Sequence, residues 1–498
     1  MHWSSTRMAV SRSVVLSNEF SFLTVIMESK MTKEDKTSAT PDRASSLSRR
    51  TFLQGSVGAA AALGTIAAVA TPKSAVAQTK PAPVITPITE ITTPISKAKE
   101  PFPIDFIRGA HERWSTPNWQ SGGDDSVYYN LNIPAFFKTD TVPATLPRKV
   151  LERDIKPELD ALTFTLKDGG QADALSDYLV GPKRVQAMMM AHKGKVVFEE
   201  FPGMNPNDYH IWMSASKTSA GLMIALLEAE GLLDLSQPCS TYAPQLKGSE
   251  WDKVTLKNAA NMAVGLDMEE SFENLSRNDT WIAKFFAAVF EGEGDEWIVM
   301  LNEAQPLPGE PQGTHFRYSS AITQVLTLAV EHVTGLKFLD AFNQRVWSKI
   351  GVDGPFMIAL APDGTAIGGG GNFTTAEDLL RYAMIYTPSW NMVSDERVVT
   401  PELYQHIHDM GDPAAYKGST EEGYHADWFG APGERNSCQW DCVFADGAMF
   451  KHGNMGQGIY VDPERDFCGM TFALGPNLGG PDHSPGYLRA AAKVLAGG

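Results

Sequence analysis

The stretch YHIWMSASKTSAGLMIALLEAEG, residues 209–231, predicts a buried helix with a polar first turn. Its apolar side chains recur at helical spacing: Leu222, Met223, Leu226 and Leu227. Gly231 stands just past the last of them, where a glycine commonly ends a helix. By contrast, Ser214, Ser216 and Lys217 crowd the amino-terminal end of the segment. A serine and a lysine at the start of an apolar helix raise the question of what chemistry they perform.

Ser214 and Lys217 are spaced to act on one another. Residues three apart lie on one face of a helix, so their side chains face the same way. The helix amino terminus adds partial positive charge and free N–H groups, which favour a neutral lysine and stabilise an oxyanion formed at the serine. A serine hydroxyl becomes a strong nucleophile when a neighbouring base takes its proton. The S-x-x-K pattern alone is common by chance, and a helix cap with a solvated lysine also accounts for it.

The segments around this helix predict an α+β fold. A hairpin precedes it in RVQAMMMAHKGKVVFEEF (184–201), where two apolar runs flank HKGK. Residues 232–390 have mostly helical periodicity, and GGGGNFTTAEDLLRYAMIY (368–386) places a flexible glycine run before a helix. A second hairpin (458–474) and a closing helix (484–497) end the chain. Strands at both ends predict one sheet assembled from distant segments, with an inserted, mostly helical region.

Two further motifs follow in order along the chain. Tyr318 lies in HFRYSSA (315–321), and Lys451 begins KHG in FKHGNMGQGIYVDPERD (450–466). With S-x-x-K, these motifs make residues 180–496 resemble the serine hydrolases of the class C β-lactamase and penicillin-binding-protein superfamily, whose hallmarks are S-x-x-K, Y-x-N and K-T-G. The likeness is strongest to the subgroup of 6-aminohexanoate-dimer hydrolases and related esterases. The resemblance implies a β-lactamase/transpeptidase-like antiparallel sheet flanked by helices.

The resemblance also implies a role for each matching residue. Ser214 would be the acylated nucleophile and Lys217 the base that activates it, while Tyr318 would protonate the leaving group and later activate water. The backbone N–H groups of Ser214 and Asn454 would form the oxyanion hole. Three residues would line the strand edge beside the substrate: Lys451, His452 and Gly453. Such a hydrolase needs neither a cofactor nor a metal.

Two positions depart from the family pattern and bear on the substrate. Ser320 stands in place of the Y-x-N asparagine as a substrate-binding residue, and His452 replaces the K-T-G threonine. In β-lactamases those residues contact the substrate amide and carboxylate, so their replacement favours an amidase or esterase acting on a small amide or ester. Lys451 keeps one cationic group available for an acidic substrate end. The alternatives are a true β-lactamase or D-alanyl peptidase, and a catalytically silent binding or sensor domain on the same fold.

Residues 1–77 are predicted to be an export signal. SRRTFLQG (48–55) is a twin-arginine motif, followed by a short apolar run and by AVA ending at Ala77. The run spans about 15 residues, fewer than the roughly 20 that cross a bilayer, so we expect cleavage after Ala77 and no stable membrane insertion. The expected partner is the twin-arginine export machinery, and the expected location is the periplasm or the exterior. Met27 and Met31 are alternative starts that the sequence leaves open.

The composition of the chain after residue 77 predicts how it divides into a linker, an extension and a domain. Residues 78–100 form a Pro- and Thr-rich linker, residues 101–180 an amino-terminal extension in which 146–162 is helix-like, and residues 181–498 the hydrolase domain. The net charge of −17 argues against binding to nucleic acid or to an anionic membrane surface.

Three groups of side chains leave alternatives open. The cysteines form no C-x-x-C pair, and the sequence does not fix their pairing: Cys239, Cys438, Cys442 and Cys468. Three tryptophans fit either a pocket wall or the core: Trp212, Trp428 and Trp440. The HIH triplet at 406–408 lacks a third ligand, which favours a surface helix over a metal site.

Overall fold

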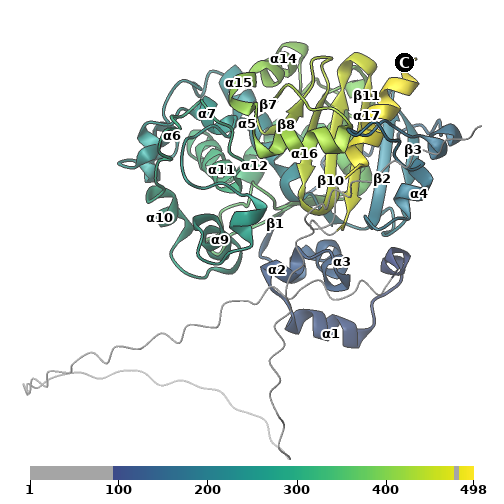
Figure 1. Cartoon of the computed structure of the whole chain (residues 1–498), viewed down its shortest axis with the longest axis horizontal. Coiled ribbons are helices and arrows are strands. Elements are labelled where there is room, and N and C mark those ends of the chain that lie inside the picture. The colour runs from purple at the N-terminus through teal and green to yellow at the C-terminus, as the bar shows by residue number, and fades with distance from the viewer. Residues whose placement is uncertain (1–93, 476–481, 498) are drawn as a thin grey trace, which may run out of the picture. The chain divides into compact units, whose positions relative to one another are not determined.

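A seven-stranded antiparallel sheet runs through the part of the chain that the structure describes, residues 94–475 and 482–497 (Figure 1). In this computed structural model the strands are, in spatial order, β3 (Lys195–Glu200), β2 (Val185–His192), β11 (Phe467–Ala473), β10 (Gln457–Asp462), β9 (Met449–Gly453), β8 (Trp440–Val443) and β7 (Arg435–Ser437). Both predicted hairpins are confirmed, as β2–β3 and β10–β11. The sheet therefore joins segments from both ends of the chain.

Both faces of this sheet are covered. On β2, Met189 belongs to the apolar cluster that includes α13 (Ala376–Met384), whereas Met188 and Met190 belong to the cluster that includes α17 (Ser484–Leu495). The helix α16 (Thr420–Phe429) packs beside α17 (Figure 1). A strand that is buried on both faces needs a continuous apolar run, which explains the three consecutive methionines.

A four-stranded antiparallel sheet connects the amino-terminal extension to the rest of the fold. Its strands are, in spatial order, β1 (Thr139–Val142), β5 (Phe356–Ala359), β6 (Asn372–Thr374) and β4 (His210–Ile211). Thr139 pairs with Ala359, so the extension contributes an edge strand. The described residues lie within one compact unit, Thr79–Gly498. The predicted signal segment and residues 78–93 of the predicted linker lie outside the described residues.

The other described α-helices surround the two sheets. They are α1 (Ile104–Glu112), α2 (Thr116–Trp119), α3 (Asp124–Leu131), α4 (Leu175–Leu179), α5 (Lys217–Ala229), α6 (Cys239–Tyr242), α7 (Leu256–Ala260), α8 (Phe272–Leu275), α9 (Trp281–Phe286), α10 (Trp297–Asn302), α11 (Ser320–Thr334), α12 (Phe338–Arg345), α14 (Pro401–Asp409) and α15 (Pro413–Tyr416). The helices α6 to α12 form the predicted helical insertion between β4 and β5. Among the described helices, none combines the length and the apolar character that crossing a bilayer requires.

The stretch 209–231 is only partly helical. His210 and Ile211 form strand β4, in which His210 pairs with Thr374. Residues Met213–Ser216 form a 3₁₀ turn, η4, and α5 begins at Lys217. The prediction of one continuous helix is therefore wrong at its start, because pairing with a distant strand fixes an extended backbone there. As predicted, the helix ends just before Gly231, which has a φ of 72°.

The prediction of a helix over residues 146–162 is also wrong. Its residues are irregular apart from a short 3₁₀ helix, η3 (Pro157–Ala161). The backbone hydrogen bonds of this segment go to β3: Asp154 N–H donates to the Val196 carbonyl, and Val196 N–H donates to Glu152. Tertiary pairing again replaces the local helical bonds.

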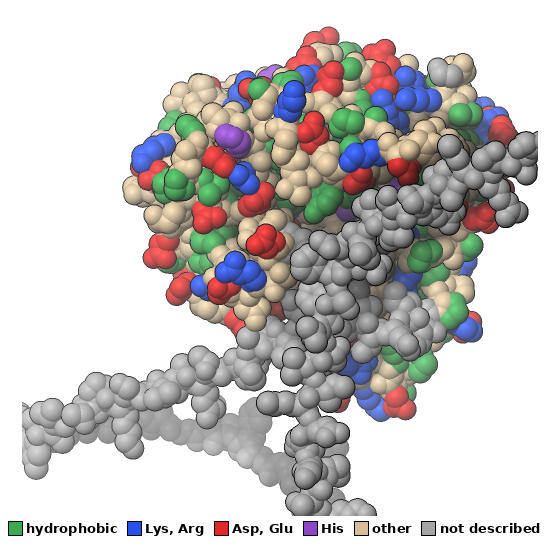
Figure 2. Space-filling view, in the orientation of Figure 1, with side chains coloured by type: hydrophobic (Ala, Val, Ile, Leu, Met, Phe, Trp, Pro, Cys, Tyr) green, Lys and Arg blue, Asp and Glu red, His purple; other side chains and the backbone are tan. Residues whose placement is uncertain are grey.

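The structure describes all three groups of side chains whose roles the sequence left open: the cysteines, the three tryptophans and the HIH triplet. All four cysteines are buried free thiols. Trp212 and Trp440 are core residues, and Trp428 packs on His452 with ring centroids 4.3 Å apart. The HIH triplet lies on α14, where His406 contacts Glu228. On the face shown in Figure 2, the described acidic side chains are interspersed with Lys and Arg.

Candidate active site

Ser214 lies in a tight turn between β4 and α5. The residue before it, Met213, has a φ of 48°, in the left-handed region that non-glycine residues rarely adopt. Met455, the residue after Asn454, has a φ of 69°. Unusual backbone conformations of this kind cluster at functional sites, because surrounding structure must hold them in place. Ser214 and Asn454, whose backbone N–H groups the family resemblance assigns to the oxyanion hole, therefore each adjoin such a position.

Lys217 is fully buried and its ammonium group faces three oxygen atoms. Its Nζ lies 3.0 Å from Ser214 Oγ, 2.8 Å from Ser320 Oγ and 2.6 Å from the Gly369 carbonyl oxygen. Burial lowers the pKa of Lys217 from 10.5 to about 7, although the charge of Glu270 opposes the shift. A substantial fraction of the amine is therefore neutral at physiological pH, and a neutral amine next to a serine hydroxyl is able to accept its proton.

Tyr318 lies between two lysines. Its ring centroid is 5.1 Å from Lys217 Nζ and 4.6 Å from Lys451 Nζ, and its hydroxyl oxygen accepts a hydrogen bond from Lys451 at 3.2 Å. Burial raises the pKa of Tyr318 well above 10, and the charges of Asp441 and Glu270 add to the rise. The phenol therefore stays protonated near neutral pH and is a proton donor in the resting site.

Lys451 is paired with a buried carboxylate on the neighbouring strand. Its Nζ lies 2.5 Å from Asp441 Oδ1, and the other oxygen of Asp441 accepts the His452 N–H at 3.0 Å. Both side chains are almost inaccessible to solvent. The expected free cation for an acidic substrate end is therefore absent at Lys451, because Asp441 already compensates its charge. The His452 ring contacts Asp482, with Nε2 3.1 Å from Oδ2.

Gly453 brings the end of β9 against the turn that holds Ser214. A Cβ at this position would lie 2.5 Å from the Trp212 carbonyl oxygen and 3.2 Å from the Ala215 nitrogen. Only glycine permits so close an approach of the two backbones. The next residue, Asn454, donates from Nδ2 to Gln120 Oε1 at 2.7 Å. The extension thus holds the side chain of a predicted site residue.

Ser320 and Glu270 meet at the amino terminus of α11. The Ser320 N–H donates to Glu270 Oε2 at 2.7 Å, and the Ser320 hydroxyl accepts from Lys217. A carboxylate at a helix amino terminus interacts favourably with the helix dipole. Ser320 therefore positions the lysine as well as bordering the space beside Ser214.

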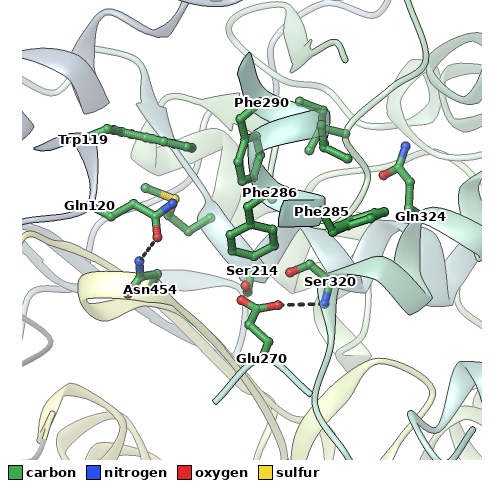
Figure 3. A pocket seen from close by; sticks show the side chains of 15 residues that line it. Trp119, Gln120, Ser214, Glu270, Phe285, Phe286, Phe290, Ser320, Gln324 and Asn454 are labelled. Atoms are coloured by element: carbon green, nitrogen blue, oxygen red, sulfur yellow. Dashed lines mark hydrogen bonds between the residues drawn. The ribbon is translucent and has the colours of Figure 1, made fainter. Parts of the chain in front are cut away.

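A pocket that is open in part to solvent adjoins Ser214 (Figure 3). Its apolar lining is Trp119, Met213, Phe285, Phe286, Val289, Phe290 and Ile367. Its polar lining is Gln120, Ser214, Glu270, Ser320, Gln324 and Asn454, together with the backbone of Gly369 and Gly370.

The structure brings together Ser214, Lys217, Tyr318 and Ser320, and places Lys451 against Tyr318. It turns the His452 ring toward Asp482 and Trp428. Several residues were missed: Trp119, Gln120, Glu270, Gly369 and Asp441. A lone acidic residue in the apolar strand WDCV was a usable sign for Asp441. The glycine run (368–371) is more than the flexible segment that its composition predicts, because Gly369 provides a carbonyl that fixes the Lys217 side chain.

Comparisons with known proteins show which family and which fold the chain resembles. The sequence profile of the family described as Beta-lactamase matches residues 183–494. A 6-aminohexanoate-dimer hydrolase from Paenarthrobacter ureafaciens is 28% identical over 284 residues, which are 55% of this chain and 69% of that protein. A solved structure from Bacillus anthracis, provisionally named a 6-aminohexanoate-dimer hydrolase, matches with a TM-score of 0.61 and 20% identity, over 76% of this chain and 97% of that chain.

Proposed function

Because the chain belongs to the beta-lactamase family, we propose that it is a serine hydrolase that cleaves an amide or ester bond of a small substrate through an acyl-enzyme at Ser214. The observation that supports this most directly is the buried Lys217, with its Nζ 3.0 Å from Ser214 Oγ and its pKa lowered to about 7. A lysine with only a structural role would not need to be buried next to an uncharged hydroxyl group, so this arrangement favours a catalytic base.

In the first half-reaction, neutral Lys217 takes the Ser214 proton as Oγ attacks the carbonyl carbon of the substrate. The carbonyl oxygen becomes an oxyanion, which the N–H groups of Ser214 and Asn454 stabilise. When the bond to the leaving group breaks, Tyr318 donates a proton to the departing nitrogen or oxygen. The acyl group then remains on Ser214.

In the second half-reaction, water replaces the leaving group. Tyr318, which has lost its proton, accepts one from the water as the water oxygen attacks the acyl carbon. The bond to Oγ then breaks, and protonated Lys217 returns the proton to Ser214. The products are a carboxylic acid and an amine or alcohol, and all side chains are back in their starting protonation states.

Two features favour an amidase or esterase over a β-lactamase. Ser320 replaces the asparagine of Y-x-N, and its hydroxyl is engaged with Lys217. Lys451 is neutralised by Asp441, which leaves little net attraction for a β-lactam carboxylate. The relative from Paenarthrobacter ureafaciens is named a 6-aminohexanoate-dimer hydrolase, and this supports testing that linear dimer.

The test compares the purified chain with a Ser214→Ala variant on p-nitrophenyl acetate, nitrocefin and a linear 6-aminohexanoate dimer. We expect turnover of the ester or the amide that disappears in Ser214→Ala, and an acyl adduct on Ser214 detectable by mass spectrometry. Turnover of nitrocefin alone would favour a β-lactamase instead. Equal behaviour of two folded proteins on every substrate would contradict the mechanism and favour a binding domain.

We also propose that the protein is exported by the twin-arginine machinery and cleaved after Ala77. The supporting features are the paired Arg49 and Arg50, the short apolar run and the small residues before the expected cleavage site. Replacing both arginines by lysine is expected to retain the uncleaved chain in the cytoplasm. Cell fractionation and amino-terminal sequencing would measure this, and unchanged export of the double variant would refute it.

A further inference from the structure

We propose that the pocket beside Ser214 binds the acyl part of the substrate and selects an uncharged apolar chain, and that Trp119 of the amino-terminal extension is a specificity-determining residue. This inference rests on the proposed acyl-enzyme chemistry. It assigns a substrate class to the site and a role to residues that precede the family match, which begins at residue 183.

The position of Tyr318 identifies which part of the substrate the pocket holds. The leaving group must depart next to the Tyr318 hydroxyl, because that group protonates it. The pocket is bordered by Ser214 and Asn454, between which the carbonyl oxygen would lie, but Tyr318, although described, is not part of its lining. The pocket therefore extends from the carbonyl carbon away from the leaving group, where the acyl chain must lie.

The lining of the pocket suits an apolar chain. Phe290 packs edge-on against Trp119, with ring centroids 5.6 Å apart, and against Phe286 at 5.0 Å. Aromatic walls stabilise apolar ligands by removing their surface from water. Figure 3 shows these rings on one side of the pocket, with Glu270 beside Ser214 and Ser320 on the other.

The charges at the pocket disfavour acyl chains that end in a carboxylate or in an ammonium group. Of the described residues that line the pocket, Glu270 is the one with a charged side chain, and it accepts the Ser320 N–H. An acyl chain ending in a carboxylate would meet no cation among the aromatic rings. An acyl chain ending in an ammonium group would lose its hydration there, while Glu270 lies near the serine at the start of the chain.

Trp119 is held firmly enough to shape the pocket. It lies at the end of α2, and the N–H of Thr116 on the same helix donates to Glu291 Oε1 at 3.0 Å. Glu291 ends η7 (Ala287–Glu291), the π-helical turn that carries Phe290. This bond fixes the extension to the turn that carries Phe290, so Trp119 and Phe290 belong to one structural unit on the aromatic side of the pocket.

The test measures kcat/KM on four p-nitrophenyl esters: acetyl, hexanoyl, 5-carboxypentanoyl and 6-aminohexanoyl. We expect the hexanoyl ester to exceed each of the other three by about tenfold or more, since each methylene that leaves water for an apolar site raises the rate severalfold. Trp119→Ala and Phe290→Ala are each expected to reduce the hexanoyl-to-acetyl ratio by about fivefold. The ratio is independent of the folded fraction, so partial destabilisation does not obscure the result.

Phe106→Ala is the matched control. Phe106 is an aromatic residue of the same extension, stacked on Phe102 at 5.4 Å and outside the pocket lining, so the ratio should not change. Hydrolysis that depends on Ser214 but shows no hexanoyl preference, or a preference unaffected by both pocket variants, would overturn the pocket assignment and leave the hydrolase proposal intact. Absence of Ser214-dependent turnover on all four esters would overturn both.

Discussion

At the scale of single residues, the proposed mechanism depends most on whether Lys217 is protonated. Burial lowers its pKa to about 7, so below that pH the ammonium form predominates and is unable to accept the Ser214 proton. We therefore expect kcat/KM to rise by about tenfold per pH unit on the acid side and to level off above about pH 7. A pH–rate profile on a neutral ester measures this.

The alkaline side of the same profile is a separate check. The pKa of Tyr318 is raised well above 10 by burial, so no loss of activity from phenol ionisation is expected up to pH 9. A profile that is flat from pH 5 to 9, or one that falls through pH 7, would contradict Lys217 as the base. Thermal unfolding measured at each pH separates loss of fold from loss of activity.

At the level of elements, close contact between β9 and η4 depends on Gly453. An added methyl group would meet backbone atoms of Trp212 and Ala215, which have no flexible end to move aside. We expect Gly453→Ala to push the strand away from Ser214 and to lower kcat by at least about tenfold, since displacing an oxyanion donor has effects of that order. Steady-state kinetics on the acetyl ester measures the loss.

Gly423→Ala is the control for that substitution. Gly423 is a helical residue of α16, with no atom within 4 Å of an added Cβ. Alanine there should leave kcat unchanged and raise stability by about 0.4–1 kcal/mol, because it restricts the unfolded chain. If Gly453→Ala were as active as Gly423→Ala, the contact between strand and turn would have no catalytic importance.

The buried pair Lys451–Asp441 joins β8 to β9. Removing one partner leaves the other charge buried and unpaired, so Asp441→Asn and Lys451→Met should each destabilise the fold by about 3–5 kcal/mol. The double variant should be destabilised by less than the sum of the two, since it leaves no orphan charge. Urea denaturation of the three variants measures the energetic coupling between the two residues. If the losses of unfolding free energy in the single variants simply added up in the double variant, the ion pair would contribute no coupling energy.

Local patterns predicted the elements whose contacts are local. The hairpins and α5 follow from periodicity, and Ser214 and Lys217 are near because they are three residues apart. Gly369 and Asp441 were missed as site residues because they reach Lys217 and Lys451 through tertiary contacts. The same cause explains β4, where pairing of His210 with Thr374 overrides the helical pattern. Sequence periodicity does not encode such long-range pairings.

At the scale of the whole molecule, the amino-terminal extension is an integral part of the fold. Its strand β1 pairs with β5, which lies more than two hundred residues later in the sequence. No local sequence pattern predicts this pairing. Tyr129 and Phe137 of the extension are buried in the same apolar cluster as Trp212 and Met213. The extension therefore supplies core, sheet edge and pocket wall to a family domain that begins after it.

Truncation tests this dependence. A chain that starts at Pro94 keeps every described contact and should remain soluble, unfold cooperatively and retain Ser214-dependent hydrolysis. A chain that starts at Gly181 loses β1 and exposes the cluster around Trp212, so we expect aggregation or loss of cooperative unfolding. Calorimetry, size-exclusion chromatography and ester hydrolysis compare the two. A shorter chain that matches the longer one in stability and in hexanoyl preference would mean that residues 94–180 contribute neither to the core nor to the acyl pocket.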